Sequence, residues 1–226
     1  SEFKLAPQAR VESDVLNGLI YAAAPFRLVI VNGRFSPELS KVTGLPKGVR
    51  FGSLATAITE QADIVGRYLG QLADPHARSF TALNTAFAQD GAFLSVPDGV
   101  VVEQPFQILS ISTGEASVPT MTHPRSLIVV GDRAQVQIVE TYASASPHKH
   151  FTNAITELVA CEGSIVDHYK IEEEDLDTYH VASMNIHSAR SSTVSTHAFT
   201  LGGRFVRNDI SAVLDGEGAE TTLNGL

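Results

Sequence analysis

Cysteine is almost absent from this sequence, which has one, Cys161, among 226 residues. One cysteine cannot form an intrachain disulfide and cannot hold a metal cluster alone, so we expect a reducing compartment. The sequence also lacks an apolar run of about 18 residues, the length that indicates a membrane-spanning helix. It shows no recognisable signal peptide, so nothing in it indicates export.

Charged residues are also scarce, at 18% of the chain against 43% apolar residues. This balance excludes a disordered chain and favours strands that are covered on one face. The net charge of −9 and the isoelectric point of about 5.3 disfavour nucleic acid as the main partner, because a phosphate backbone would be repelled. The length suits one large domain or two small ones.

The first residues contain two local signals. Ser1-Glu2-Phe3 is typical of a remnant left by cloning, so we expect the native residues to begin near Lys4 and the chain to be a piece of a longer protein. Within Phe26–Phe35, Asn32-Gly33 separates two apolar runs, which is the strongest short signal of a β-hairpin.

Two helices are predicted before residue 91. Apolar residues at helical spacing indicate a helix within Phe51–Ala73, with Ser53 as its N-cap. A second helix is predicted over 74–91, with Asp74 as the cap, Pro75 in the first turn and Gly91 at the end.

After Gly91 the helical signals disappear and four strand–turn–strand units follow. The units start at Ser126, Asn153, His180 and Arg204, so the first two intervals are 27 residues and the third is 24. Each unit has a turn of small or charged residues in its middle: Gly131-Asp132-Arg133, Glu162-Gly163, Ser188-Ala189-Arg190 and Gly216-Glu217-Gly218.

This period, with two strands in each repeat, predicts a parallel β-solenoid in which each unit is one coil. Stacking buries the inner faces and pairs each strand with its counterpart in the next coil about 4.8 Å away. An antiparallel sandwich with regularly spaced hairpins is the alternative. We therefore expect a mainly β fold, with 1–90 as a small helical or α/β portion and 91–226 as the solenoid core.

Two loops between the predicted coils hold candidates for chemistry. His148 and His150 flank Lys149 and could share a metal, but no third ligand lies nearby, so a solvated loop is preferred. The acidic run Glu172–Asp175, with Asp177, could bind calcium but lacks the glycine-punctuated spacing of a calcium loop. A solvated loop or an acidic surface that faces a partner is favoured there.

The remaining candidates lie in or near the repeat strands: His168, His180, His187, His197 and Cys161. If the coils stack, His168 and His197 would lie in neighbouring coils, since each follows its turn by a few residues. A ladder of side chains on one solenoid face is the preferred interpretation, ahead of a metal or proton-relay site. Cys161 has no basic neighbour or helix N-terminus that would activate its thiol.

No catalytic, cofactor-binding or metal-binding residue is assigned from these patterns. Leu201–Gly203 and Gly216–Gly218 lack the spacing and the lysine of a phosphate loop. A Ser-His-Asp arrangement cannot be assigned, because the sequence does not place its serines and histidines together. The residues therefore indicate a scaffold or interaction protein that is not an enzyme.

Two segments resemble the SufB/SufD family. Phe80–Leu109, with Leu83-Asn84, Asp90-Gly91 and Val96-Pro97, is similar to the segment where family members pass from N-terminal helices into their core. Leu201–Leu226 is similar to the middle of that core. The stretches "LGGRFVRND" and "RLVIVNGRFSPELS", and the absence of a cysteine-rich N-terminal stretch, are more similar to the SufD branch than to the SufB branch.

The resemblance implies a right-handed parallel β-helix and membership of the SUF scaffold for iron–sulfur cluster assembly. It implies SufB and the ATPase SufC as protein partners, a supporting role in cluster assembly and iron acquisition, and a location in the bacterial cytoplasm or the plastid stroma. It places the iron–sulfur cluster in the full SufBCD complex and no cofactor in this fragment. Family members are longer, so the SufB-contacting face, its cluster-related histidine and the SufC-docking helices are expected beyond Leu226.

Two alternatives remain from the residues alone. A carbohydrate-active β-helix enzyme of the pectate-lyase kind would use clustered carboxylates on an outer face, for which Glu172–Asp177 is the support. A purely structural solenoid is the other. A chain cut after the turn of its fourth coil is also expected to leave Leu223–Leu226 as an unpaired edge that promotes self-association.

Overall fold

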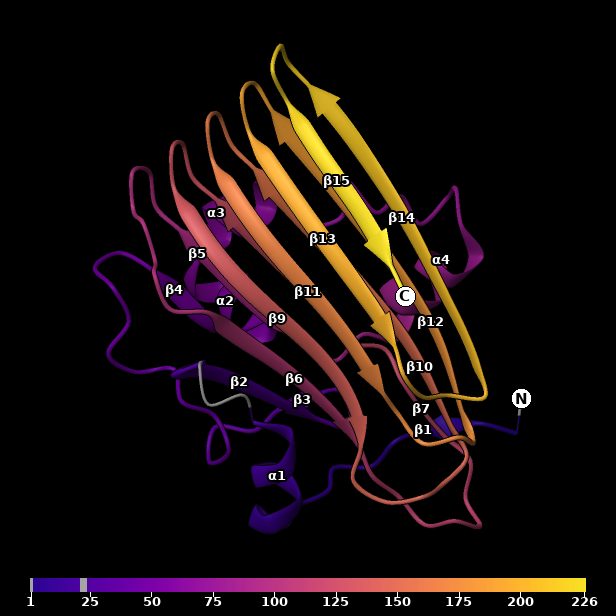
Figure 1. The fold of residues 1–226 in the computed structure, drawn as a ribbon. Coiled ribbons are helices and arrows are strands. Elements are labelled where there is room, and N and C mark those ends of the chain that lie inside the picture. The colour runs from indigo at the N-terminus through magenta and orange to yellow at the C-terminus, as the bar shows by residue number, and fades with distance from the viewer. Residues whose placement is uncertain (1, 21–23) are drawn as a thin grey trace.

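The computed structural model describes residues 2–20 and 24–226, and its main feature is a parallel β-solenoid. The chain passes repeatedly from a strand of one sheet to a strand of a second sheet, and each pass forms one coil (Figure 1). Strands of successive coils pair in parallel in both sheets. The predicted solenoid is confirmed, and the antiparallel sandwich is excluded.

Strands from both sides of residue 90 join each sheet. The first sheet contains β1 (Lys4–Leu5), β4 (Arg50–Ser53), β5 (Ala92–Val96), β7 (Thr120–Thr122), β8 (Arg125–Val130), β10 (His150–Ala160), β12 (Thr178–Ala189) and β14 (Phe205–Asp215). The second contains β2 (Phe26–Val31), β3 (Arg34–Phe35), β6 (Phe106–Ser112), β9 (Gln135–Ser144), β11 (Ile165–Glu173), β13 (Thr193–Thr200) and β15 (Glu220–Gly225). The helices are α1 (Ser13–Leu19), α2 (Leu54–Glu60), α3 (Ala62–Tyr68) and α4 (Ser79–Phe87).

The register between coils differs from the predicted one. Ser126 pairs with Thr156, an offset of 30 residues, whereas the repeat alignment placed it opposite Asn153. Asn153 pairs with Val181, so the next offset is 28. The loops that join the coils differ in length, and this difference shifts the true repeat away from the apparent period.

The turns, in contrast, stack as predicted. The amide of Arg133 donates to the carbonyl of Glu162 at 2.8 Å, and the amide of Gly163 donates to the carbonyl of Arg190 at 2.9 Å. Ser191 donates in the same way to Glu217 at 3.0 Å. The Gly-Glu-Gly turn is therefore the corner of the last coil.

The N-terminal portion covers the first edge of the solenoid. The predicted hairpin is confirmed, because β2 and β3 pair antiparallel around Asn32 (φ 49°) and Gly33 (φ 76°), the left-handed conformations of a type I′ turn. In the other sheet, β4 pairs antiparallel with β5. These reversed strands occupy the edges at which another parallel strand could otherwise add.

A helical layer packs on the outer face of the first sheet. Ser53 caps α2 as predicted, because its hydroxyl accepts a hydrogen bond from the amide of Thr56 at 3.1 Å. The predicted helix is interrupted at Gln61 (φ −127°), so it forms α2 and α3. Buried residues of these helices pack on strand residues of the sheet: Leu54, Ala57 and Val65 against Phe93, Leu127, Val129 and Val159.

The second predicted helix is shorter than expected. Asp74 caps an isolated turn, in which the amide of His76 donates to its carboxylate at 2.8 Å, and α4 begins after the extended residue Arg78 (φ −140°). Asp90 lies beyond α4 and accepts a hydrogen bond from the hydroxyl of Ser53 at 2.9 Å. Among the described residues no helix follows α4, and none is long and apolar enough to cross a membrane.

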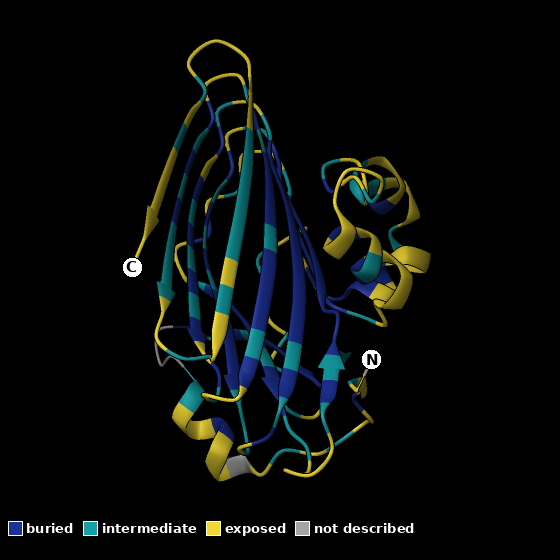
Figure 2. Cartoon of the chain, turned by 90° about the vertical axis from the view of Figure 1, so that its right-hand side faces the viewer, coloured by how far each residue is buried: buried dark blue, intermediate teal, exposed yellow. Residues whose placement is uncertain are grey.

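The main core lies between the two sheets and includes fully buried leucine and isoleucine side chains such as Leu94, Ile108, Ile128, Ile138 and Leu158. Exposure increases toward β14 and β15, as Figure 2 shows. In the part of the chain that the structure describes, β15 pairs with β13 alone and ends its sheet. Self-association through this edge stays a prediction.

Candidate functional site

A polar network fills one half of the solenoid interior. Residues that alternate along β9, β11 and β13 point between the sheets, and the inward positions of the first half are apolar: Val136, Ile138, Val166 and Val194. Further along the same strands the buried positions become polar: Glu140, Tyr142, His168, Lys170, Glu172 and Thr196. The change falls at a similar height in successive coils, so the polar side chains stack on one another.

Glu140 is the centre of the first part of the network. Its carboxylate accepts hydrogen bonds from the hydroxyls of Tyr142 at 2.7 Å and Thr156 at 2.9 Å, and from Nε2 of His168 at 3.0 Å. Burial acts to raise the pKa of Glu140, but the hydrogen bond and charge of His168, with help from Tyr142 and Lys170, outweigh it and lower the pKa to about 2. Glu140 is therefore a fixed buried carboxylate.

Lys170 is the centre of the second part. Its ammonium lies 2.9 Å from Nε2 of His180, contacts Asn208 and lies 5.2 Å from the ring centre of Tyr142. Nδ1 of His180 is 2.6 Å from Glu174. Burial lowers the pKa of Lys170 to about 8 and lowers the pKa of His180 well below its usual range. A neutral His180 can accept from Lys170 at one nitrogen and donate to Glu174 from the other.

The acidic run is divided between the interior and the surface. Glu172 and Glu174 are buried, whereas Glu173 and Asp177 are exposed, so the prediction of a solvated acidic loop is wrong for the first two. Extension of β11 to Glu173 alternates the side chains and turns Glu172 inward. Burial raises the pKa of Glu172 and of Glu174 to about 7. The carbohydrate-active alternative is left without its outer carboxylate cluster.

The prediction of a solvated His148–His150 loop is also wrong. Both histidines are buried, because β10 begins at His150 and the alternation turns Lys149 outward. The two ring nitrogens of His150 lie 2.8 Å and 3.1 Å from the hydroxyls of Thr120 and Thr122. Burial lowers the pKa of His150 to about 3, so it is a neutral core histidine.

The other candidate histidines do not form a ladder. His168 and His197 do lie in neighbouring coils, but His168 pairs in register with Thr196 and faces inward, while His197 stacks on Tyr169 with ring centres 5.1 Å apart. His187 lies near the surface with Nε2 3.0 Å from Asp215.

Cys161 is half-buried, and burial raises the pKa of its thiol, with Asp132 and Asp98 acting in the same direction. This agrees with the prediction that the thiol is not activated.

The network is suited to holding protons and to tying the coils together. Its cavity, of about 20 Å³, has room for about one water molecule. Within residues 2–20 and 24–226, no group of three or more His, Cys, Asp or Glu side chains is arranged to hold a metal ion. No step through an iron–sulfur cluster can be derived from these residues.

The comparisons with known proteins cover nearly the whole chain. The sequence profile of the SufBD core domain of the SUF iron–sulfur cluster assembly system matches residues 110–226, and the profile of the SufBD N-terminal region matches residues 22–108.

Curated relatives include an iron–sulfur cluster assembly SufBD family protein of Synechocystis, 29% identical over 88% of this chain and 46% of its own length. Iron–sulfur cluster assembly protein SufD of Escherichia coli is 25% identical over 99% of this chain and 49% of its own length. SufB of Bacillus subtilis is 26% identical over 76% of this chain and 37% of its own length. The chain spans about half the length of the first two relatives or less of the third, and it belongs to the SufB/SufD family of SUF iron–sulfur cluster assembly proteins, in which it is SufD-like.

Proposed function

We propose that the chain acts in the scaffold on which the SUF system assembles iron–sulfur clusters. It pairs with SufB, works with the ATPase SufC, supports cluster assembly and iron acquisition, and performs no catalytic step alone. The observation that carries the proposal is the match of both SufBD profiles, one after the other, to a chain that folds as a solenoid. The cluster and its iron are the cargo of this assembly.

The chemistry of the described residues supports a scaffold. The buried titratable groups pair with one another around a cavity that has room for about one water molecule, so they do not face a substrate-sized space. The outer surfaces are then the parts available to protein partners. We place the protein in the bacterial cytoplasm, or in the plastid stroma if its source is a plant or alga, because one cysteine suits a reducing compartment.

Co-purification tests the proposal. The affinity-tagged protein is co-expressed with SufB and SufC of the same organism, and the eluate is examined by size-exclusion chromatography with light scattering. We expect SufB and SufC to co-elute with it at a fixed ratio, whereas a tagged unrelated protein retains neither. Recovery of SufB only in the unbound fraction would overturn the assignment.

The role in iron acquisition has its own readout. Complexes purified without oxygen are analysed for iron and sulfide, with and without co-expression of this chain. We expect less iron in SufB and SufC prepared without it. Equal iron contents, in the presence of a stable complex, would contradict the iron role and leave the scaffold assignment in place.

A further inference from the structure

An aromatic ladder runs across the outer face of the first sheet. The strand register aligns side chains of five neighbouring strands in one row: Leu5, Met121, Phe151, Tyr179 and Phe205. The ladder is partly open to solvent, because Phe205 at its end is 51% exposed. Singly exposed apolar residues are ordinary, but a continuous row of them marks an interaction site.

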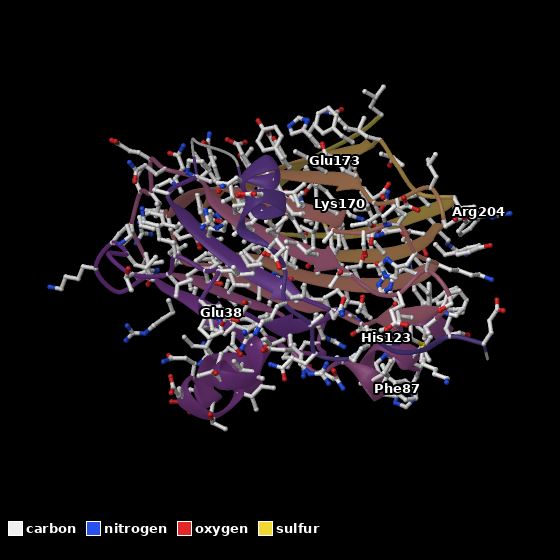
Figure 3. The ribbon with its side chains drawn as sticks, turned by 90° about the horizontal axis from the view of Figure 1, so that it is seen from below. Glu38, Phe87, His123, Lys170, Glu173 and Arg204 are labelled. Atoms are coloured by element: carbon white, nitrogen blue, oxygen red, sulfur yellow. The ribbon has the colours of Figure 1, made fainter. Side chains whose placement is uncertain are left out.

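Helix α4 forms the second wall beside this ladder. Phe80 and Phe87 are each 41% exposed and face the same groove, and the ring of Phe80 lies 6.1 Å from that of Phe151. Figure 3 shows Phe87 beside His123, with ring centres 5.7 Å apart, and Arg204 on the same side of the molecule. The space between α4 and the ladder, here called the aromatic groove, has a volume of about 520 Å³.

The chain's own first residues show how a peptide binds at one end of this groove. Glu2–Ala6 is extended and adds to the edge of β7 as a parallel strand. The amide of Lys4 donates to the carbonyl of Pro119 at 3.1 Å, and the amide of Ala6 donates to the carbonyl of Met121 at 2.9 Å. Main-chain pairing of this kind holds a segment largely independently of its sequence, while side-chain pockets select it.

The selecting contacts come from the two residues that precede the strand. The Phe3 ring lies edge-on to Phe151 and Tyr179, with ring centres 6.1 Å and 6.2 Å away. The ammonium of Lys149 lies 5.5 Å from the Phe3 ring centre and 2.5 Å from the carboxylate of Glu2. One lysine therefore contacts both a carboxylate and the aromatic ring that follows it, through an ion pair and a cation–π contact.

The rim of the groove is basic in a protein whose net charge is −9. Four basic side chains make ion pairs around it, against two acidic partners beyond Glu2: Lys149, Arg78, Arg204 and Arg207 with Asp177 and Asp209. Without Glu2 the rim has an excess of positive charge. Charge complementarity therefore favours an acidic ligand.

We propose that the aromatic groove is a docking site for an extended peptide segment of a partner protein in which a carboxylate residue directly precedes an aromatic residue. Glu2-Phe3 occupies the site within the chain, so a partner segment competes with it. The proposal stands on the geometry of the groove and does not depend on the role in cluster assembly.

Fluorescence polarisation tests this with a labelled synthetic peptide of the sequence Glu-Phe-Lys-Leu-Ala, titrated with the full chain. A tethered competitor acts at an effective concentration in the millimolar range, so Phe3→Ala is expected to tighten binding of the peptide at least about tenfold. Lys149→Glu in the Phe3→Ala protein is expected to weaken it about tenfold. A peptide with lysine in place of its glutamate is expected to recover affinity for the Lys149→Glu protein.

Ile58→Ala is the matched control, because Ile58 is a similarly exposed apolar residue on α2, outside the groove. It is expected to leave peptide binding unchanged. Binding that is absent in the Phe3→Ala protein, or insensitive to the charge exchange, would overturn the proposal. Light scattering that shows a dimer lost on Phe205→Ala would also overturn it, because a second copy would then occupy the groove.

Discussion

The buried ion pair between Arg125 and Glu157 attaches the helical layer to the solenoid, and its removal is the strongest test of the fold. Arg125 donates from Nε and Nη2 to Oε2 of Glu157 at 3.1 Å and 2.8 Å, with side-chain exposures of 7% and 0%. Oε1 of Glu157 accepts hydrogen bonds from the amides of Gly70, Leu72 and Ala73 at 2.9 Å, 3.2 Å and 3.2 Å. One carboxylate therefore satisfies a buried cation and three backbone donors that follow α3.

The expected cost of Glu157→Ala follows from these partners. Removing one member of a buried ion pair costs about 3–5 kcal/mol, because the other charge stays buried. Each buried amide that loses its acceptor adds roughly 1–3 kcal/mol, unless water enters the space that the side chain leaves. We therefore expect the free energy of unfolding to fall by at least about 4 kcal/mol, a large part of the 5–15 kcal/mol or so that is typical of a native domain.

Two measurements check this expectation. Urea denaturation followed by circular dichroism gives the change in stability, and hydrogen exchange shows whether the amides of Gly70, Leu72 and Ala73 lose protection. Glu157→Gln keeps an acceptor oxygen and is expected to lose less. The paired change of Arg125→Met with Glu157→Met is expected to recover stability relative to Glu157→Ala, because no charge is then left buried.

A surface ion pair supplies the control. Arg204 and Asp177 lie 3.3 Å apart with side-chain exposures of 61% and 64%, so Arg204→Ala is expected to change stability by no more than about 0.5 kcal/mol. A Glu157→Ala protein that loses less than about 1 kcal/mol and keeps its exchange protection would refute the reasoning.

Three further changes test the interior and the close contacts. The pKa of Glu174 is raised by burial to about 7 from 4.5, so the stability it contributes is fully present below about pH 4.5 and is lost as the pH rises through 7; the free energy of unfolding of the protein relative to Glu174→Gln, measured by urea titration, should fall by on the order of 1–3 kcal/mol across that range, and a flat difference would contradict the buried carboxyl. Asn84, whose amide donates to two buried carbonyls at 3.0 Å and 2.9 Å, should cost roughly 1–3 kcal/mol when changed to alanine, and an unaltered melting temperature would refute this anchor of α4. Gly91→Ala should prevent native packing, because its Cβ would lie 1.6 Å from a backbone oxygen, whereas Gly18→Ala in α1 meets nothing and should raise the melting temperature slightly; equal soluble yields and melting temperatures would contradict the contact.

The solenoid could be predicted because its signals are local. The turns of successive coils stack, so their small and charged residues recur at a visible period, and Asn32-Gly33 and Ser53 act through their own backbone neighbourhoods. The end of the first helix at Gln61 and the extended residue Arg78 depend on packing against the sheet, which a helical pattern does not contain.

The polar interior could not be predicted, because it depends on register. The apparent offset of 27 residues and the true offset of 30 between Ser126 and Thr156 differ by an odd number. An odd shift exchanges the inward and outward faces of a strand, so residues that share the interior seemed to lie on opposite faces. His168 and His197 show the converse error, since 29 positions separate them while their strands pair at an offset of 28.

The interior and the surface therefore have separate roles. Glu140, His168 and Lys170 come from neighbouring strands, and each satisfies a group of the next coil, so a polar row is tolerated where a single buried charge would not be. The network resists a slip of one coil against the next, because a one-residue shift would bury these groups without partners. Since its cavity holds about one water, the coils offer no passage for a peptide or a cluster, and recognition of partners must use the outer faces, where the aromatic groove lies.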